Sequence, residues 1–238
     1  MSLSIFIPCR NEEKIIKQSI SSLIKKIKIS DYEIILINDF STDKTEDLLK
    51  LIQAKYKNVK YFNNNLIPGL GPSFNIALDK ASKNFFCIYM SDMSDDVKDL
   101  EMYYRLIKKN NLDAIFGSRF LKHSKLYDYP KLKLLFNRFF NYLIKFLFWS
   151  DYNDFTNAFK MYKVSVLKKL RPIISESFNV FLEIPLKIIS RNYSYKIVPI
   201  SWRNRKIGKS KFLIKELGSK YIFTALYCWL EKALLLKK

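Results

Sequence analysis

The sequence of 238 residues has few residues of the types that bind metals through nitrogen or sulfur. His123 is its only histidine, so a zinc site, which needs several nitrogen or sulfur ligands, is not expected. Cys9, Cys87 and Cys228 lie far apart and form neither a metal-ligand pattern nor a disulfide framework. Such cysteines are typical of a reducing, cytosolic compartment.

Several motifs and apolar segments are also absent. The sequence has no GxSxG nucleophile motif, no P-loop lysine motif and no glycine-rich turn after the first expected strand. A dehydrogenase is therefore not expected, because the pyrophosphate of a dinucleotide would lack its usual seat. No apolar stretch reaches ~20 residues, and no basic leader precedes the first strand, so neither a membrane-spanning helix nor a signal peptide is expected.

Short apolar runs alternate with segments of helical periodicity. Strand-like runs occupy residues 4–7, 33–37, 59–62, 85–90, 114–116 and 195–200, and helical spacing recurs between them, as over residues 73–82 and 181–189. This alternation predicts an α/β protein with a mainly parallel sheet and helices on both faces.

Acidic side chains follow two of the expected strands. Asp39 comes after the second strand, and Asp92, Asp95 and Asp96 come after the fourth. In a parallel sheet, ligands bind outside the carboxyl ends of the strands. One acid at such a place is often a helix cap, but three within five residues repel one another unless they are solvated, capped or bound to a cation. Hard divalent cations take oxygen ligands and bridge to substrate phosphates.

Short motifs along the chain resemble those of one family in their order. They are Ile7-Pro8-Cys9-Arg10-Asn11-Glu12, Asn38-Asp39 with Ser41 and Asp43, Gly69-Leu70-Gly71 with Asn75, Asp92 with Asp95 and Asp96, Gly117-Ser118-Arg119-Phe120, Asp154 with Thr156, and Arg205 to Lys211. From Ile5 to about Phe212, the chain resembles glycosyltransferase family 2. This family has the GT-A (Rossmann-like) fold, and the resemblance is to its dolichol-phosphate mannose synthase-like branch.

The resemblance implies binding of a nucleotide-diphosphate-sugar donor. Asp39 is implied to read the base, and Asp92 with Asp95 to hold a divalent cation, Mg²⁺ or Mn²⁺. The sequence departs from the family in having Asn38 for the first acid of its turn, Phe40 for a glycine, and an altered metal motif. The remaining implied donor-binding residues are Pro8, Arg10, Asn11, Glu12, Gly69, Gly71 and Asn75.

The implied reaction is an inverting sugar transfer in which a nucleoside diphosphate leaves. Its developing charge needs a cation and basic side chains. A lipid phosphate acceptor is already anionic near neutral pH and needs no base, whereas a hydroxyl would want a carboxylate base, for which Asp154 is the candidate. We expect Asp92, Asp154 and Arg119 to be catalytic. Candidates for binding the acceptor or its phosphate are Arg119, Arg138, Arg205, Ser210 and Lys211.

The chain is strongly basic, with a formal net charge of +20, which indicates an anionic partner. Residues of about 131–149 mix Lys and Arg with Phe, Leu and Trp, as interfacial helices do, and residues 212–238 repeat the pattern. We therefore expect a GT-A domain over residues 1–211 that includes one interfacial helix, followed by an amphipathic membrane-associated tail. The protein would be peripheral on the cytoplasmic, inner face of a membrane. Packing on the domain's own core or on a second copy is the alternative.

Other functions compete with transfer to polyprenyl phosphate. One is a family 2 enzyme that uses a hydroxyl acceptor in polysaccharide or lipopolysaccharide synthesis; the missing QxxRW motif disfavours a processive one. A basic nucleic-acid-binding protein fits the charge, but acids at the strand ends would repel phosphates, so no nucleic acid partner is expected. An inactive scaffold is suggested by Asn38 and the altered metal motif.

Overall fold

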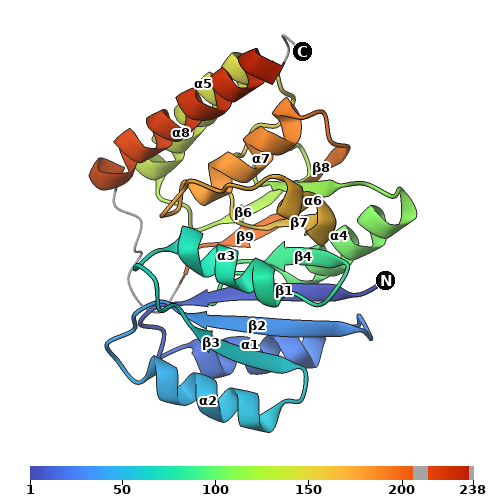
Figure 1. The fold of residues 1–238 in the computed structure, drawn as a ribbon, viewed down its shortest axis with the longest axis vertical. Coiled ribbons are helices and arrows are strands. Elements are labelled where there is room, and N and C mark those ends of the chain that lie inside the picture. The colour runs from blue at the N-terminus through green and yellow to red at the C-terminus, as the bar shows by residue number, and fades with distance from the viewer. Residues whose placement is uncertain (206–213, 236–238) are drawn as a thin grey trace.

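The computed structural model describes residues 1–205 and 214–235. Its centre is a seven-stranded sheet with the strand order β3-β2-β1-β4-β7-β5-β8 (Figure 1). The strands are β1 (Leu3–Cys9), β2 (Tyr32–Asn38), β3 (Val59–Asn63), β4 (Phe85–Ile88), β5 (Ala114–Ser118), β7 (Lys160–Lys163) and β8 (Tyr195–Pro199). All pairs are parallel except those that β7 makes with β4 and β5, which confirms the expected mainly parallel sheet.

The sequence did not predict β7 or a second, two-stranded sheet. β7 is framed by Lys160 and Lys163, so it does not read as an apolar run, although Lys160 is fully buried. Its ammonium donates to the carbonyl oxygens of Phe155 (3.0 Å) and Phe181 (3.2 Å), which offset the cost of burial. The small sheet pairs β6 (Lys125–Tyr127) with β9 (Ser201–Arg203).

Helices cover both faces of the large sheet, as predicted. One apolar layer holds buried residues of α1 (Ile16–Lys26), α2 (Thr45–Lys55) and α4 (Val97–Lys109). The other holds those of α3 (Leu70–Lys80), α6 (Val164–Lys169) and α7 (Val180–Ser190). α3 begins three residues earlier than predicted, because Gly71 and Pro72 fit the first turn of a helix, where proline loses no hydrogen bond.

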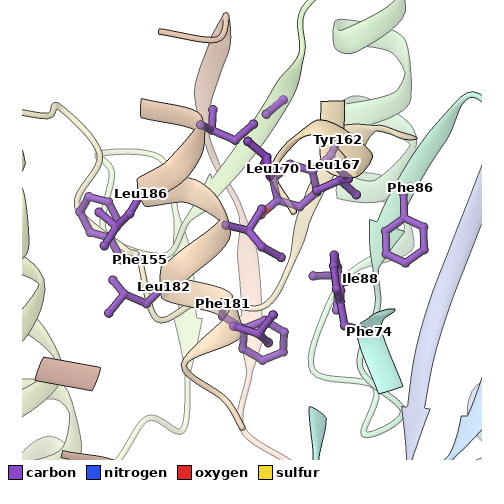
Figure 2. Close-up of a cluster of buried hydrophobic side chains, with 14 of the residues drawn as sticks. Phe74, Phe86, Ile88, Phe155, Tyr162, Leu167, Leu170, Phe181, Leu182 and Leu186 are labelled. Carbon is purple, nitrogen blue, oxygen red and sulfur yellow. The ribbon is translucent and has the colours of Figure 1, made fainter. Parts of the chain in front are cut away.

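Helix α7 lies deep in the second layer. Figure 2 shows its residues Leu182 and Leu186 in the same buried cluster as Phe74 of α3 and Phe86 of β4. The edge-to-face contact of Phe74 with Phe86, with ring centroids 5.4 Å apart, extends this cluster to the sheet. This apolar layer holds α3 and α7 against the sheet.

Two helices, α5 (Lys131–Phe148) and α8 (Ile214–Leu235), lie together at one end of the molecule, opposite α2 (Figure 1). They run in the same direction, because Phe140 contacts Tyr221, with ring centroids 5.6 Å apart, and Lys232 donates to the carbonyl oxygen of Phe148 (2.9 Å). α8 also packs on α7, where Asn179 donates to Thr224 (2.9 Å). Within the described residues, no helix has the length and apolar composition needed to cross a bilayer.

Candidate active site

The site lies at the carboxyl ends of β1, β2 and β4. The strand order turns around at β1, with β2 on one side and β4 on the other, and such a switch point is where open α/β sheets bind ligands. β1 ends next to Arg10, β2 is followed by Asp39, and β4 leads into the loop that carries Asp92. The expected placement of the acids at this edge of the sheet is therefore what the structure shows.

Asp39 is buried and held by the loop after β3. Its Oδ1 accepts hydrogen bonds from the backbone N–H of Gly69 (2.8 Å) and from Nδ2 of Asn64 (2.9 Å). Its Oδ2 forms an ion pair with Nη1 of Arg10 at 3.7 Å. These contacts fix the direction of the carboxylate before any ligand is bound.

Asn11 and Glu12 join the loop after β1 to the loop after β2. Oδ1 of Asn11 accepts from the backbone N–H of Thr42 (2.7 Å), and the backbone N–H of Glu12 donates to Oγ1 of Thr45 (2.8 Å). The Glu12 carboxylate is paired with Nη2 of Arg205 (2.9 Å). Arg205, predicted to bind phosphate, thus lies beside a predicted donor-binding residue.

Gly69 and Gly71 have a packing role that the sequence did not reveal. A Cβ at Gly69 would lie 2.2 Å from the carbonyl oxygen of Glu176, and a Cβ at Gly71 would lie 1.7 Å from that of Ser175. The backbone N–H of Gly71 donates to the Glu176 carbonyl oxygen (3.1 Å). These glycines let the segment before α7 approach the start of α3. Asn75, one turn further along α3, is half-buried.

The three acids after β4 have different environments. Oδ1 of Asp92, which is half-buried, accepts from the backbone N–H of Ser94 (3.0 Å), and Asp96 caps α4 by accepting from the N–H of Lys98 (2.9 Å). Asp95 is buried, and its burial and the charge of Asp92 raise its pKa to about 8. Within the described residues, no group of three His, Cys, Asp or Glu side chains is arranged to hold a metal ion.

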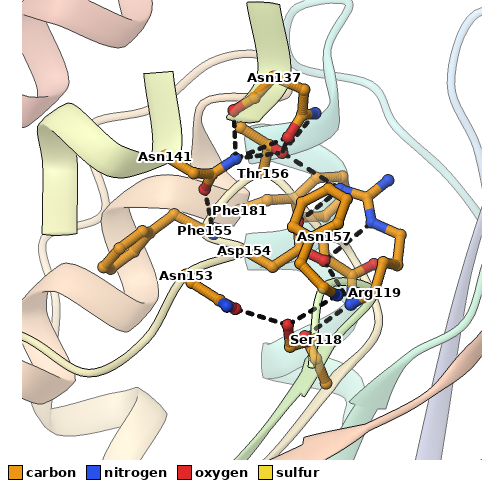
Figure 3. A network of polar contacts seen from close by, with 12 residues as sticks. Ser118, Arg119, Asn137, Asn141, Asn153, Asp154, Phe155, Thr156, Asn157 and Phe181 are labelled. Atoms are coloured by element: carbon orange, nitrogen blue, oxygen red, sulfur yellow. Dashed lines mark hydrogen bonds and ion pairs between the residues drawn. The ribbon is translucent and has the colours of Figure 1, made fainter. Parts of the chain in front are cut away.

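Arg119 and Asp154 form a buried, two-point ion pair (Figure 3). Nε of Arg119 donates to Oδ2 of Asp154 (2.9 Å), and Nη2 donates to Oδ1 (2.6 Å). The backbone N–H of Arg119 adds a third bond to Oδ2 (2.8 Å). Burial alone would lower the pKa of Arg119, but the charge and hydrogen bonds of Asp154 raise it above its usual range. Both carboxylate oxygens of Asp154 are thus engaged with Arg119.

A pocket of about 140 Å³ lies between the loop after β4 and the Arg119–Asp154 ion pair. Asp92, Asp95 and Arg119 line it, together with Lys133, which was not predicted from the sequence. Burial and the charge of Arg119 lower the pKa of Lys133. Two cations and two acids therefore share one small space, an arrangement suited to binding a cation and an anion side by side. Aromatic walls come from Tyr129 and Trp202, whose rings lie 5.6 and 5.7 Å from the Arg119 guanidinium.

A spacing in the sequence would have revealed Lys133. In the apolar helix α5, polar residues recur four apart at Lys133, Asn137 and Asn141, and so share one face. Figure 3 shows that Asn137 and Asn141 both donate to Oγ1 of Thr156. The same oxygen accepts from Nη2 of Arg119 (3.2 Å). This polar stripe faces the site.

The remaining predicted binding residues that the structure describes do not line this pocket. The Arg138 guanidinium lies over the rings of Phe120 and Tyr142, each 4.8 Å away, and does not line the pocket. Ser210 and Lys211 fall outside the described residues. Pro8, predicted to bind the donor, lies near the end of β1 and pairs with Ile37 of β2.

The sequence is similar to those of known glycosyltransferases over most of its length. Glycosyltransferase AglD of Haloferax volcanii is 19% identical over 224 residues, which are 92% of this chain and 36% of that protein. The dolichol-phosphate mannosyltransferase of Pyrococcus furiosus is 25% identical over 222 residues, 91% of this chain and 61% of that protein. The chain thus spans between about a third and three fifths of the length of these relatives.

Glucosyl-3-phosphoglycerate synthase of Mycobacterium tuberculosis, solved with Mn²⁺, UDP and phosphoglyceric acid, has a TM-score of 0.73 to this chain at 17% identity. The match covers 96% of this chain and 78% of the synthase chain, and it confirms the expected GT-A fold. The sequence also matches the family described as Glycosyl transferase family 2 over residues 4–171. The chain belongs to glycosyl transferase family 2.

Proposed function

We propose that this protein transfers a sugar from a nucleotide-diphosphate sugar to a lipid phosphate such as polyprenyl phosphate at a membrane surface, with inversion at the anomeric carbon. The observation that carries the proposal is the position of helix α5. One face of α5 places Lys133 in the pocket with Asp92 and Arg119, and the opposite face exposes large apolar side chains. A lipid with an anionic head group is the acceptor that fits both faces.

A divalent cation, Mg²⁺ or Mn²⁺, suits the acidic loop. Oδ2 of Asp95 is buried and has no hydrogen-bond partner among the described residues, and Asp92 shares its pocket. An unpaired buried carboxylate oxygen is costly, and a hard cation would satisfy it. Asp92 and Asp95 would hold the ion, which would supply positive charge to the departing diphosphate. Glucosyl-3-phosphoglycerate synthase of Mycobacterium tuberculosis has also been solved with Mg²⁺ and UDP, which supports a divalent cation here.

The acceptor needs no general base if it is a phosphate, because its second proton leaves near pH 6. This matters because Asp154, the candidate base, has both oxygens bonded to Arg119 and is fully buried. In our proposal Asp154 positions the Arg119 guanidinium, which with Lys133 binds the acceptor phosphate. The relative named dolichol-phosphate mannosyltransferase supports a lipid phosphate.

The apolar surface of α5 and α8 would rest on the membrane. We call it the α5–α8 patch. Contiguous exposed apolar surface of this kind marks an interaction site, and Lys131 on α5 is available to an anionic leaflet. A second copy of the chain, which would make a homo-oligomer, is the other occupant to test. The exposed members of the patch are Leu132, Leu135, Phe136, Phe139, Tyr142, Leu143, Phe146, Trp149, Ile222, Phe223, Leu226, Trp229, Leu230 and Leu234.

Transfer of labelled sugar to defined acceptors tests the proposal. We expect labelled lipid with polyprenyl phosphate and Mg²⁺ or Mn²⁺, and none with dephosphorylated polyprenol or after chelation. Lys133→Gln should raise KM for the lipid phosphate about tenfold and leave KM for the donor unchanged, since one charge-assisted contact to phosphate is lost. Lys168→Gln, an exposed lysine on α6, is the matched control. Turnover on a soluble glycan without any labelled lipid would establish the hydroxyl-acceptor alternative instead.

A further inference from the structure

Lys160 is a buried cation that the proposed function does not use. It begins β7, and its side chain is fully buried. Its ammonium donates to the carbonyl oxygens of Phe155 (3.0 Å) and Phe181 (3.2 Å), and to that of Asn157. An ammonium has three N–H donors, so there is one carbonyl acceptor for each. Because burying a charge is costly, a lysine at this place needs an explanation in what it holds together.

The three carbonyl groups come from two segments that form walls of the pocket. Phe155 and Asn157 belong to the loop between α5 and β7, and Phe181 lies in the first turn of α7. Asn157 and Phe181 also line the pocket. The same loop carries Asp154, whose carboxylate bonds the Arg119 guanidinium (Figure 3). One ammonium therefore ties the loop that holds Arg119 to helix α7.

The carbonyl groups depend on this ammonium. In a regular α-helix the carbonyl oxygen of Phe181 would accept from the N–H four residues later, but that residue is Pro185, which has none. Among the described residues, no donor other than Lys160 bonds the carbonyl oxygens of Phe155 and Asn157. A neutral or shorter side chain would leave at least one of these groups unsatisfied, and the loop can relieve that cost only by moving.

We propose that Lys160 is a positioning residue for the acceptor: its ammonium holds the loop of Asp154, and through it the Arg119 guanidinium, in the place where the acceptor phosphate binds. The inference rests on the function proposed above. Lys160 itself does not line the pocket. Loss of its charge should therefore weaken binding of the acceptor and leave binding of the donor, which we place at the ends of β1 and β2, unchanged.

The charge of Lys160 is sensitive to pH. Burial lowers the pKa of Lys160 to about 7. A neutral amine has two N–H donors for three carbonyl groups, so a rise in pH should act like a neutral substitution. The titratable and charged groups around it are Asp154 and Asp95, which raise this pKa, Arg119, which lowers it, Tyr152, whose ring lies 5.6 Å from Nζ, and the Glu183–Lys187 ion pair of α7.

Kinetics with polyprenyl phosphate and Mn²⁺ test the proposal. Lys160→Gln has two N–H donors and no charge, so KM for the lipid phosphate should rise about tenfold while KM for the donor stays the same. Lys160→Arg, which stays charged at every working pH, should restore acceptor binding. Lys163→Gln is the control, because this lysine of the same strand bonds Asp113 (3.0 Å) instead. Equal rises in both KM values of Lys160→Gln would indicate a merely structural role and overturn the proposal.

The pH dependence separates the charge of Lys160 from its shape. Between about pH 6 and about pH 9, KM for the lipid phosphate should rise about tenfold in the wild type relative to Lys160→Arg. Titration of the acceptor phosphate and of Lys133 cancels in this ratio, because both proteins share them. An unchanged ratio would contradict the proposal. If neither variant folds, a wild-type KM that does not rise above about pH 7, where the phosphate has lost its second proton, would do the same.

Urea unfolding tests the ammonium without any acceptor. The pKa of Lys160 is about 7 in the folded chain, below its ordinary value of 10.5. Between these values the unfolded chain binds more protons, so this group makes the wild type more stable as the pH rises through that window. Lys160→Gln should lack this gain, and an equal gain in both proteins would overturn the inference. A wild type that uses no lipid phosphate would refute the proposed function, and the unfolding result would still stand.

Discussion

Helices α5 and α7 are both rich in apolar residues, but they are placed in opposite ways. Of the eleven residues of α7, ten are buried, including the charged pair Glu183 and Lys187. Of the eighteen residues of α5, only Asn141, Ile144 and Phe148 are buried. α7 is the kind of helix that a large core encloses on all sides, whereas α5 presents its apolar side outward.

The two helices also treat their polar residues differently. In α7, Glu183 and Lys187 satisfy each other, with 2.7 Å between Oε1 and Nζ, and the Glu183 carboxylate accepts from the backbone N–H of Ile174 (2.9 Å) and of Ser175 (2.8 Å). In α5, the polar stripe faces the pocket instead, with Lys133 at the site. Apolar content alone therefore does not say whether a helix is a core element; the direction of its polar residues does.

The largest effect should come from breaking the ion pair inside α7. Glu183→Ala would leave the Lys187 ammonium without its charge partner and two backbone N–H groups without acceptors. We expect a loss of about 3–5 kcal/mol in the free energy of unfolding, measured by urea titration. Glu176→Gln, which breaks the exposed pair with Lys220 at 3.5 Å, should change it by less than about 0.5 kcal/mol. Similar losses in both variants would contradict the role given to burial.

Truncating one apolar side chain on each helix compares them directly. Leu186→Ala in α7 should cost about 2–5 kcal/mol, because it leaves a cavity in a packed layer (Figure 2). Phe139→Ala in α5 should cost less than about 0.5 kcal/mol, because that side chain is 63% exposed. Urea unfolding in detergent-free buffer measures both. A large loss for Phe139→Ala that depends on protein concentration would show that a second copy covers the α5–α8 patch.

The outward face of α5 should matter for vesicle binding. Replacing Phe139 and Phe146 together with serine should weaken binding to anionic vesicles at least about a hundredfold, since burying each Phe side chain contributes about 1.5–3 kcal/mol. Cosedimentation at several lipid concentrations gives the partition coefficient. Leu51→Ser is the control, because Leu51 is also an exposed apolar side chain, at 59%, but lies on α2 at the other end of the molecule. Full-length protein that stays in the supernatant at low salt would exclude the membrane contact.

The smallest effect should come from the lysines of α5. Lys131→Gln with Lys145→Gln should weaken binding to anionic vesicles by about 1 kcal/mol for each charge and leave binding to neutral vesicles unchanged. Lys108→Gln with Lys109→Gln on α4 removes the same charge from exposed positions elsewhere. An equal loss on neutral and anionic vesicles would show that the lysines do not act through charge.

Local patterns predicted much of the fold. Apolar runs such as the one ending near Met90 located the parallel strands, and the turn residues after them located Asp39 and Asp92, because strand ends are marked by short-range signals. β7 was not predicted, because it is short and begins with Lys160, a lysine that is buried in the folded protein. The burial of Lys160 depends on the carbonyl oxygens of Phe155, five residues earlier, and of Phe181 on α7, which only the tertiary structure brings to it.

Contacts within the site were less predictable. Arg119 and Asp154 are 35 residues apart, so their pairing follows from tertiary structure and not from a local pattern. The same holds for Gly71, whose missing side chain makes room for a segment more than a hundred residues later in the chain. The resemblance to a family located these residues, but only the structure shows what each one touches.

The ion pair between Arg119 and Asp154 has a consequence for the entropy of ligand binding. An arginine side chain that is free in solution loses rotamer freedom when an anion arrives, and that loss weakens binding. Here two hydrogen bonds from the Arg119 guanidinium to the Asp154 carboxylate have already ordered this side chain during folding. An anion that binds this guanidinium, as we propose, would therefore meet an already ordered arginine side chain, and little rotamer entropy would be lost on binding.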